Sequence, residues 1–140
     1  YLAIKNLDDR QFKKAVLVLT TGMNIFLFIS FVWPTGLNLR ESIVYDLHTL
    51  SGNLLKFVQT VDTPKSVFPS MHVYVTLVLQ YTLEMQKKLI PSWGIWVGRV
   101  LAVLIVLSTM FTKQHSVLDV SAAIVMFAVL VVVVEKIVKK

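Results

Sequence analysis

Cysteine is absent from this 140-residue sequence, and charged residues make up only 16% of it. The absence of cysteine excludes disulfide bonds, thiolate metal sites and cysteine nucleophiles. Soluble domains are usually about a quarter charged, so the shortage of charge, with a hydrophobic content of 56%, argues against a soluble domain. No signal peptide is recognised, because a charged stretch opens the sequence, and we expect further residues upstream of Tyr1.

The apolar residues are concentrated in four blocks, at about residues 15–33, 67–85, 93–111 and 117–134. Each block is close to the ~20 residues that cross a hydrocarbon core of ~30 Å as a helix. The last block is rich in valine and isoleucine, but a lone strand cannot satisfy its backbone hydrogen bonds in lipid. The sequence therefore predicts an all-α, polytopic transmembrane helix bundle of about four spans, forming a single domain over residues 1–140.

The net charge of +6 would suggest nucleic-acid binding in a soluble protein, but here the basic residues cluster beside the apolar blocks. We therefore expect a bilayer around the protein and no nucleic-acid partner. If every block spans, nine basic residues fall on one side: Lys5, Arg10, Lys13, Lys14, Lys87, Lys88, Lys136, Lys139 and Lys140. The other side receives Arg40, Lys56, Lys65 and Lys113, and Arg99 lies inside the third block, where it can snorkel to the cytoplasmic interface. By the positive-inside rule both termini are cytoplasmic, and we expect a plasma-membrane protein.

The long outer segment between the first two blocks carries an amphipathic pattern. Its apolar residues recur at spacings of three and four: Ile43, Val44, Leu47, Leu50, Leu54, Phe57 and Val58. This spacing predicts a helix over about residues 42–58 that lies on the outer leaflet or caps the bundle.

Residues suited to chemistry lie at the outer ends of the predicted spans. His115 and Asp119 are four apart, so on a helix the carboxylate can accept the imidazole N–H and make the other ring nitrogen a nucleophile or general base. Ser70 and His72 follow a proline at a helix start, where backbone N–H groups favour a bound anion. Taken alone, each pattern also fits ordinary structure: a chance pair, a helix cap and an interfacial histidine.

The combination of these residues favours a functional site, because two histidines, an aspartate and a serine fall at one depth and ionisable residues in spans are costly. His72, His115 and Asp119 form a conceivable metal site, but the serine and nearby basic residues suit an anion better. We therefore expect an anion site without a metal. The third histidine, His48, lies on the polar side of the amphipathic segment and is interpreted as solvated.

At these residues the sequence resembles a known family. Residues 69–72 read Pro-Ser-Met-His and residues 115–119 read His-Ser-Val-Leu-Asp, which resemble two signatures of the type 2 phosphatidic acid phosphatase superfamily. Residues 62–72 are similar to the branch that includes inositol phosphorylceramide synthases and sphingomyelin synthase-like proteins. Residues 33–35 (Trp-Pro-Thr), with Arg40 downstream, resemble the first outer loop of that branch. Two basic residues of the superfamily pattern are missing, since no lysine lies at the matching position before Arg40 and Thr109 stands in place of an arginine. Arg40 is also followed by Glu41, where that pattern has a proline.

The resemblance implies a six-span fold of which this chain is the C-terminal part, with the site on the extracytoplasmic face. It implies a phosphohistidine mechanism without a cofactor, in which His115 attacks phosphorus, Asp119 activates it and His72 transfers protons. Ser70, Arg40 and Lys113 would hold the phosphate oxygens. The implied function is a membrane phosphatase or phosphotransferase acting on a lipid phosphate or phospholipid. Two alternatives stay open, a non-catalytic membrane scaffold of the same fold and a proton-coupled transporter.

Overall fold

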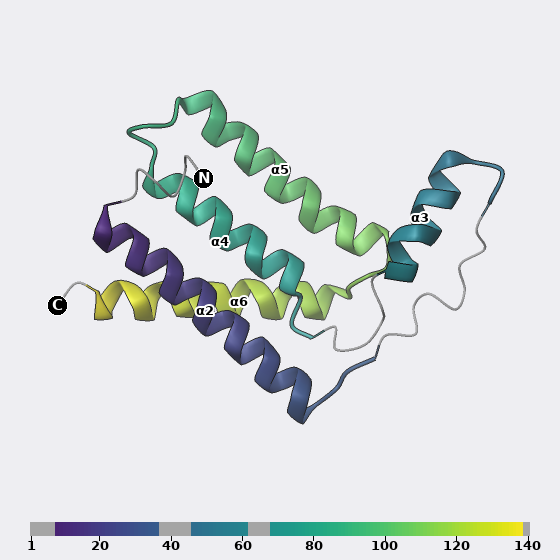
Figure 1. The fold of residues 1–140 in the computed structure, drawn as a ribbon, viewed down its shortest axis with the longest axis horizontal. Coiled ribbons are helices and arrows are strands. Elements are labelled where there is room, and N and C mark those ends of the chain that lie inside the picture. Colours follow the sequence, from purple (N-terminus) through teal and green to yellow (C-terminus); the bar gives the residue numbers. More distant parts are fainter. Residues whose placement is uncertain (1–7, 37–45, 62–67, 139–140) are drawn as a thin grey trace.

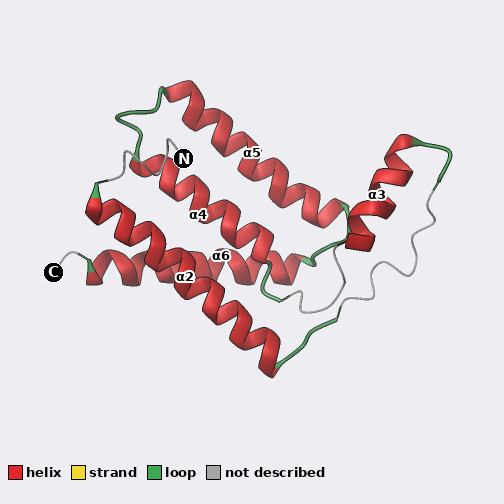
Figure 2. Ribbon diagram, viewed as in Figure 1, coloured by secondary structure: helices red, strands yellow, loops and turns green. Residues whose placement is uncertain are grey.

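The computed structural model describes residues 8–36, 46–61 and 68–138. These ranges contain five helices: α2 (Asp9–Val32), α3 (Leu50–Val61), α4 (Met71–Met85), α5 (Ser92–Phe111) and α6 (Val117–Ile137). Within the described ranges no strand occurs, which confirms the predicted all-α class (Figures 1 and 2).

Three of the helices are long and apolar enough to cross a membrane, namely α2, α5 and α6. Helix α4 has 15 residues and so measures about 22 Å, which is shorter than a hydrocarbon core of ~30 Å. The span predicted over 67–85 is too long at its beginning, because Pro69 and Ser70 precede the helix and the Ser70 side chain caps it. Three spans are therefore supported by length and composition, and the fourth stays a prediction.

Helix α4 lies at the centre of the bundle and packs against α2, α5 and α6 (Figure 1). Its side chains Val73, Tyr74 and Val78 are buried, whereas many apolar side chains of α5 and α6 are exposed. This distribution is typical of a bundle whose outer helices face lipid and whose central helix faces protein.

A close approach joins α2 to α4. A Cβ atom at Gly22 would lie 2.1 Å from Cζ of Tyr74, so a larger residue does not fit there without displacing the ring. The Tyr74 hydroxyl donates a hydrogen bond of 2.5 Å to the carbonyl of Val18. Phe127 of α6 packs edge-on against Tyr74, with ring centroids 6.3 Å apart. One buried tyrosine thus connects three helices.

Ion pairs connect the helices at the end of the bundle where α4 finishes. Lys14 Nζ of α2 lies 2.6 Å from Glu135 Oε2 of α6, and the Tyr81 hydroxyl donates to Glu135 Oε1 at 2.8 Å. Arg99 Nε donates to Glu84 Oε1 at 2.7 Å, and its guanidinium lies 4.9 Å from the Trp96 ring centroid. Arg99 therefore meets a carboxylate of α4 at the end to which we expected it to snorkel.

Helix α3 lies beyond the other end of the bundle, beside the connection from α5 to α6 (Figure 1). The amphipathic helix predicted over 42–58 is observed in part, shifted toward the C-terminus. Asp46 accepts hydrogen bonds at its carbonyl from the backbone N–H and the hydroxyl of Thr49, so a turn replaces helix at 46–49. Residues 42–45 lie outside the described residues.

Candidate active site

The beginnings of α4 and α6 meet at one end of the bundle (Figure 1). The backbone N–H of Ser70 donates to the carbonyl of Asp119 at 3.1 Å, so the two helix starts are hydrogen-bonded directly. Ser70 is fully buried, and its Oγ accepts a hydrogen bond from Val73 N at 3.4 Å as the N-cap of α4. The first role of Ser70 is therefore structural, and it places two positive helix ends side by side.

Two histidines lie at this junction, as the sequence predicts. His72 Nδ1 is 3.4 Å from His115 Nε2, and the ring centroids are 5.6 Å apart. His115 is only 7% exposed, whereas His72 is exposed. One imidazole of the pair is therefore enclosed by protein while the other faces the surroundings.

Asp119 lies close to His115, but not in the manner expected. His115 precedes the N-cap of α6, so the two residues do not share a helical face, and His115 Nδ1 is 4.0 Å from Asp119 Oδ2. That separation exceeds a normal hydrogen bond. Asp119 Oδ2 instead accepts hydrogen bonds from the backbone N–H of Ser116 at 2.7 Å and from its hydroxyl at 2.8 Å.

Ser116 is a residue of the site that sequence reasoning missed. It forms a capping box with Asp119, because the backbone N–H of Asp119 also donates to Ser116 Oγ at 3.3 Å. The signal was the serine three residues before an acidic residue, a spacing typical of helix starts. The capping box orients the Asp119 carboxylate beside His115.

The turn between α5 and α6 holds Lys113 in a conformation that normally favours glycine. Its φ is 53°, and its backbone N–H donates to Met110 O at 3.0 Å. The backbone N–H groups of Gln114 and His115 both donate to Thr109 O, at 3.0 and 3.1 Å. This is the Schellman pattern of helix ends, with Lys113 at the position where glycine is most common. Thr109, which stands where the resembled family has an arginine, thus fixes the backbone of His115.

The remaining predicted residues are not all placed at this site. Arg40 lies outside the described residues, and so do residues 62–67 of the motif. His48 is exposed in the turn before α3, where its backbone N–H donates to Asp46 Oδ1 at 3.1 Å. Within the described ranges, no group of three histidine, aspartate or glutamate side chains has an arrangement that could hold a metal ion.

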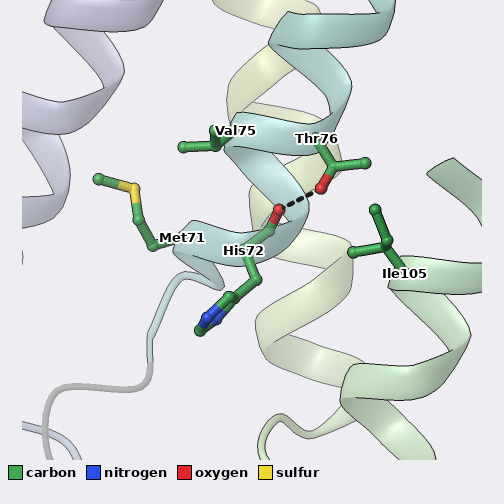
Figure 3. A pocket seen from close by; sticks show the side chains of 5 residues that line it. All are labelled: Met71, His72, Val75, Thr76 and Ile105. Carbon is green, nitrogen blue, oxygen red and sulfur yellow. Dashed lines mark hydrogen bonds between the residues drawn. The ribbon is translucent and has the colours of Figure 1, made fainter. Parts of the chain in front are cut away.

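A cavity of about 290 Å³ lies beside His72, between α4 and α5. Figure 3 shows its lining side chains, which are Met71, His72, Val75, Thr76 and Ile105. The Thr76 hydroxyl donates to His72 O at 2.7 Å, so it is satisfied within its own helix. A second, apolar cavity of about 140 Å³ lies between α2 and α4 and shares Val75 with the first. No sequence signal indicated these apolar residues, because their role depends on which helices meet.

No family model, curated protein or solved structure matches the chain.

Proposed function

We propose that this chain is the catalytic part of a membrane phosphatase or phosphotransferase that acts on lipid phosphates through a phosphohistidine. The observation that carries the proposal is the 3.4 Å approach of His72 Nδ1 to His115 Nε2 at two adjoining helix starts. Adjacent imidazoles can divide the work of nucleophile and proton donor, and helix starts attract the phosphate group.

The orientation of His115 supports its role as the nucleophile. Its Nε2 faces His72, and its Nδ1 faces the Asp119 carboxylate at 4.0 Å. A proton on Nδ1 would leave the Nε2 lone pair to attack phosphorus, with Asp119 stabilising the charge that develops on the ring. The bond from phosphorus to the leaving oxygen breaks as the bond from Nε2 to phosphorus forms.

The exposed His72 suits the proton-transfer role. As an imidazolium it donates its proton to the leaving oxygen, and as the neutral base it then accepts a proton from water or an alcohol. The oxygen of that water or alcohol attacks phosphorus, the phosphorus–Nε2 bond breaks, and His115 is regenerated. Water as acceptor gives a phosphatase, and a lipid or sugar hydroxyl gives a phosphotransferase.

The phosphate group would be held by positive charge at this end of the bundle. Lys113 is two residues before His115, and the N-termini of α4 and α6 add two sets of backbone N–H groups. Ser70 stays a candidate for the phosphate clamp, although it is fully buried and its Oγ already accepts a hydrogen bond from Val73 N. Arg40 remains a further candidate for the phosphate clamp.

A lipid phosphate fits the surroundings of His72 better than a water-soluble phosphate does. The cavity beside it is lined mainly by apolar groups, and the helices that form it have exposed apolar surfaces. An acyl chain placed between α4 and α5 would keep the phosphate at the histidines.

We further propose that α4, with the residues leading into it, also crosses the membrane. The chain then has four spans, which correspond to the C-terminal part of a six-span fold. Both termini would then be cytoplasmic in the plasma membrane, with the site outside. A cysteine at Lys65 should react with an impermeant reagent in intact cells, and one at Lys87 should react only after lysis. The reverse labelling would contradict an outward-facing site.

The experiment that tests the function is phosphate release from a panel of lipid phosphates by the purified protein in phosphatidylcholine vesicles. Wild type should form an acid-labile phosphoenzyme, and His115→Ala should form none. His48→Ala is the matched control, because His48 is exposed in a turn outside the site, and it should behave as wild type. Equal rates for wild type and His115→Ala would refute the proposal.

A non-catalytic scaffold is the second candidate, and one observation favours it. Ser70 caps α4, and Asp119 takes part in the capping box of α6, so both polar residues have sufficient structural roles. A scaffold would show unaltered folding and no phosphoenzyme with any member of the panel.

A further inference from the structure

Helix α3 presents one continuous apolar stripe to its surroundings. Leu50, Leu54, Phe57 and Val61 follow one another at spacings of four, three and four, so they lie along one side of the helix. Their exposed fractions are 78, 54, 66 and 69%. A helix that leaves this much apolar surface uncovered indicates a binding surface.

The opposite side of α3 is attached to the connection between α5 and α6. Of the twelve described residues of α3, only Gln59 is buried, and its Nε2 donates to the carbonyl of Thr112 at 2.6 Å. Gln59 follows Phe57 by two positions, which is about 200° around a helix of 3.6 residues per turn. The stripe and the attachment point therefore lie on opposite faces.

The attachment point adjoins the candidate active site. Thr112 is the C-cap of α5, Lys113 follows it with a positive φ, and His115 comes two residues later. Gln59 thus holds the beginning of the turn whose far end carries the buried histidine.

Lipid is the occupant that best fits the stripe. The exposed apolar surface of α5 continues to Phe111, which is 81% exposed and directly precedes Thr112. Helix α6 begins with Val117 and Leu118, which are 61 and 76% exposed. The apolar surface that a bilayer would cover therefore reaches the turn between α5 and α6. Helix α3 is attached to that turn through Gln59. Polar Asn53, Lys56 and Thr60 are exposed beside the stripe, a pattern typical of helices at a lipid surface.

We propose that α3 is an interfacial brace, in which the stripe from Leu50 to Val61 inserts into the lipid surface and Gln59 holds the turn that positions His115. The brace goes beyond the proposed function, because it requires only that the bundle lies in a membrane. Gln59 is a positioning residue in this arrangement, and it acts through the backbone of Thr112.

The first experiment measures the depth of α3, and the absence of native cysteine makes it direct. Nitroxide labels are placed on single cysteines at Phe57 and, as the control on the polar side of the helix, at Lys56, in phosphatidylcholine vesicles. The label at Phe57 should collide mainly with oxygen, which partitions into lipid, and the label at Lys56 mainly with a water-soluble nickel chelate. Equal nickel accessibility at both positions would overturn the brace, and so would spin–spin broadening at Phe57, which would indicate a second copy of the chain.

The second experiment measures the coupling from α3 to His115. Gln59→Leu should raise the rate at which diethylpyrocarbonate modifies His115 several-fold, with His48 as the internal reference in peptide mass spectra. Phe57→Asp should raise it similarly, whereas Thr60→Val should not, because the Thr60 hydroxyl donates to Lys56 O within its own helix. Gln59→Lys, which keeps an N–H donor, should restore the wild-type rate.

An unchanged modification rate in Gln59→Leu would overturn the positioning role. Neither experiment measures phosphate release, so failure of the brace and failure of the proposed enzymatic function are separately detectable.

Discussion

The two ends of α4 differ in how they use charge. At the end near Met85, cations meet carboxylates across helices, as in Lys14 with Glu135 and Arg99 with Glu84. At the beginning of α4, two histidines approach each other where two positive helix starts adjoin. The first arrangement neutralises charge and fastens the bundle. The second arrangement brings together groups that favour a bound anion. One end of α4 is therefore structural, and the other is the candidate catalytic end.

The largest expected effect is on catalysis at the histidine end. His72→Ala should slow phosphorylation by a lipid monoester by about 10²–10⁴-fold, the usual contribution of general acid catalysis. A nitrophenyl phosphate, whose leaving group needs no proton, should be slowed much less. Single-turnover phosphorylation measures both substrates without interference from phosphoenzyme breakdown.

The controls for this prediction are the other two members of the site. His115→Ala should abolish phosphorylation by both substrates alike, and Asp119→Asn should have an intermediate effect. If His72→Ala is the variant that forms no phosphohistidine with either substrate, the two histidines have exchanged roles.

The next effect should be on stability at the opposite end. Glu135→Gln leaves Lys14 without its counter-charge and weakens the acceptor for Tyr81, so we expect a loss of about 1–3 kcal/mol of unfolding free energy. The single-turnover rate should stay at the wild-type value. Thermal unfolding in detergent with a parallel rate measurement tests this, and a lower rate in the folded variant would show that the two ends are not independent.

A smaller effect is expected at the capping box. Ser116→Ala removes the N-cap of α6, which typically costs about 0.5–2 kcal/mol. It also removes one hydrogen bond that orients the Asp119 carboxylate, so catalysis should weaken as stability falls. Ser121→Ala is the matched control, because the Ser121 hydroxyl is exposed and donates to Val117 O in the same helix. Unaltered catalysis in Ser116→Ala would mean that the capping box does not position Asp119.

The smallest expected effect has the opposite sign for stability. Lys113→Gly relieves a left-handed conformation that costs a residue with a Cβ roughly 1–2 kcal/mol. Glycine loses roughly 0.5–1 kcal/mol more conformational entropy on folding, so the net rise in unfolding free energy should be small. Inhibition by phosphate or vanadate should weaken at the same time, because an ammonium group is lost from the phosphate region. A rise in stability with unchanged inhibition would assign Lys113 to the turn alone.

Sequence patterns predicted the broad fold because they depend on local chemistry. Helices α5 and α6 begin and end within a few residues of the predicted apolar blocks. The errors occur where capping or polar residues decide a boundary, as at Ser70 before α4 and at the turn before α3. Hydropathy describes transfer into lipid, whereas helix ends depend on which group satisfies the terminal backbone atoms.

The candidate site was likewise predicted in part, where local motifs were sufficient, and missed where contacts between distant residues decide the geometry. Two motifs were sufficient to predict that His72 and His115 lie together, because one span separates them and antiparallel neighbours bring both starts to one end. The motifs did not predict that His115 lies before the helix rather than on it, which replaces a direct bond to Asp119 with a 4.0 Å approach. They also did not indicate Gln59 or Ile105, whose partners are far away in the sequence.

The sequence by itself determined that this is an all-helical protein suited to a membrane and that histidines lie at the ends of its apolar segments, because composition and spacing act along the chain. The tertiary structure decided which histidine is enclosed and which helix holds the turn before His115. Those outcomes depend on atoms that meet only when α3, α4, α5 and α6 converge, and no local pattern specifies that convergence.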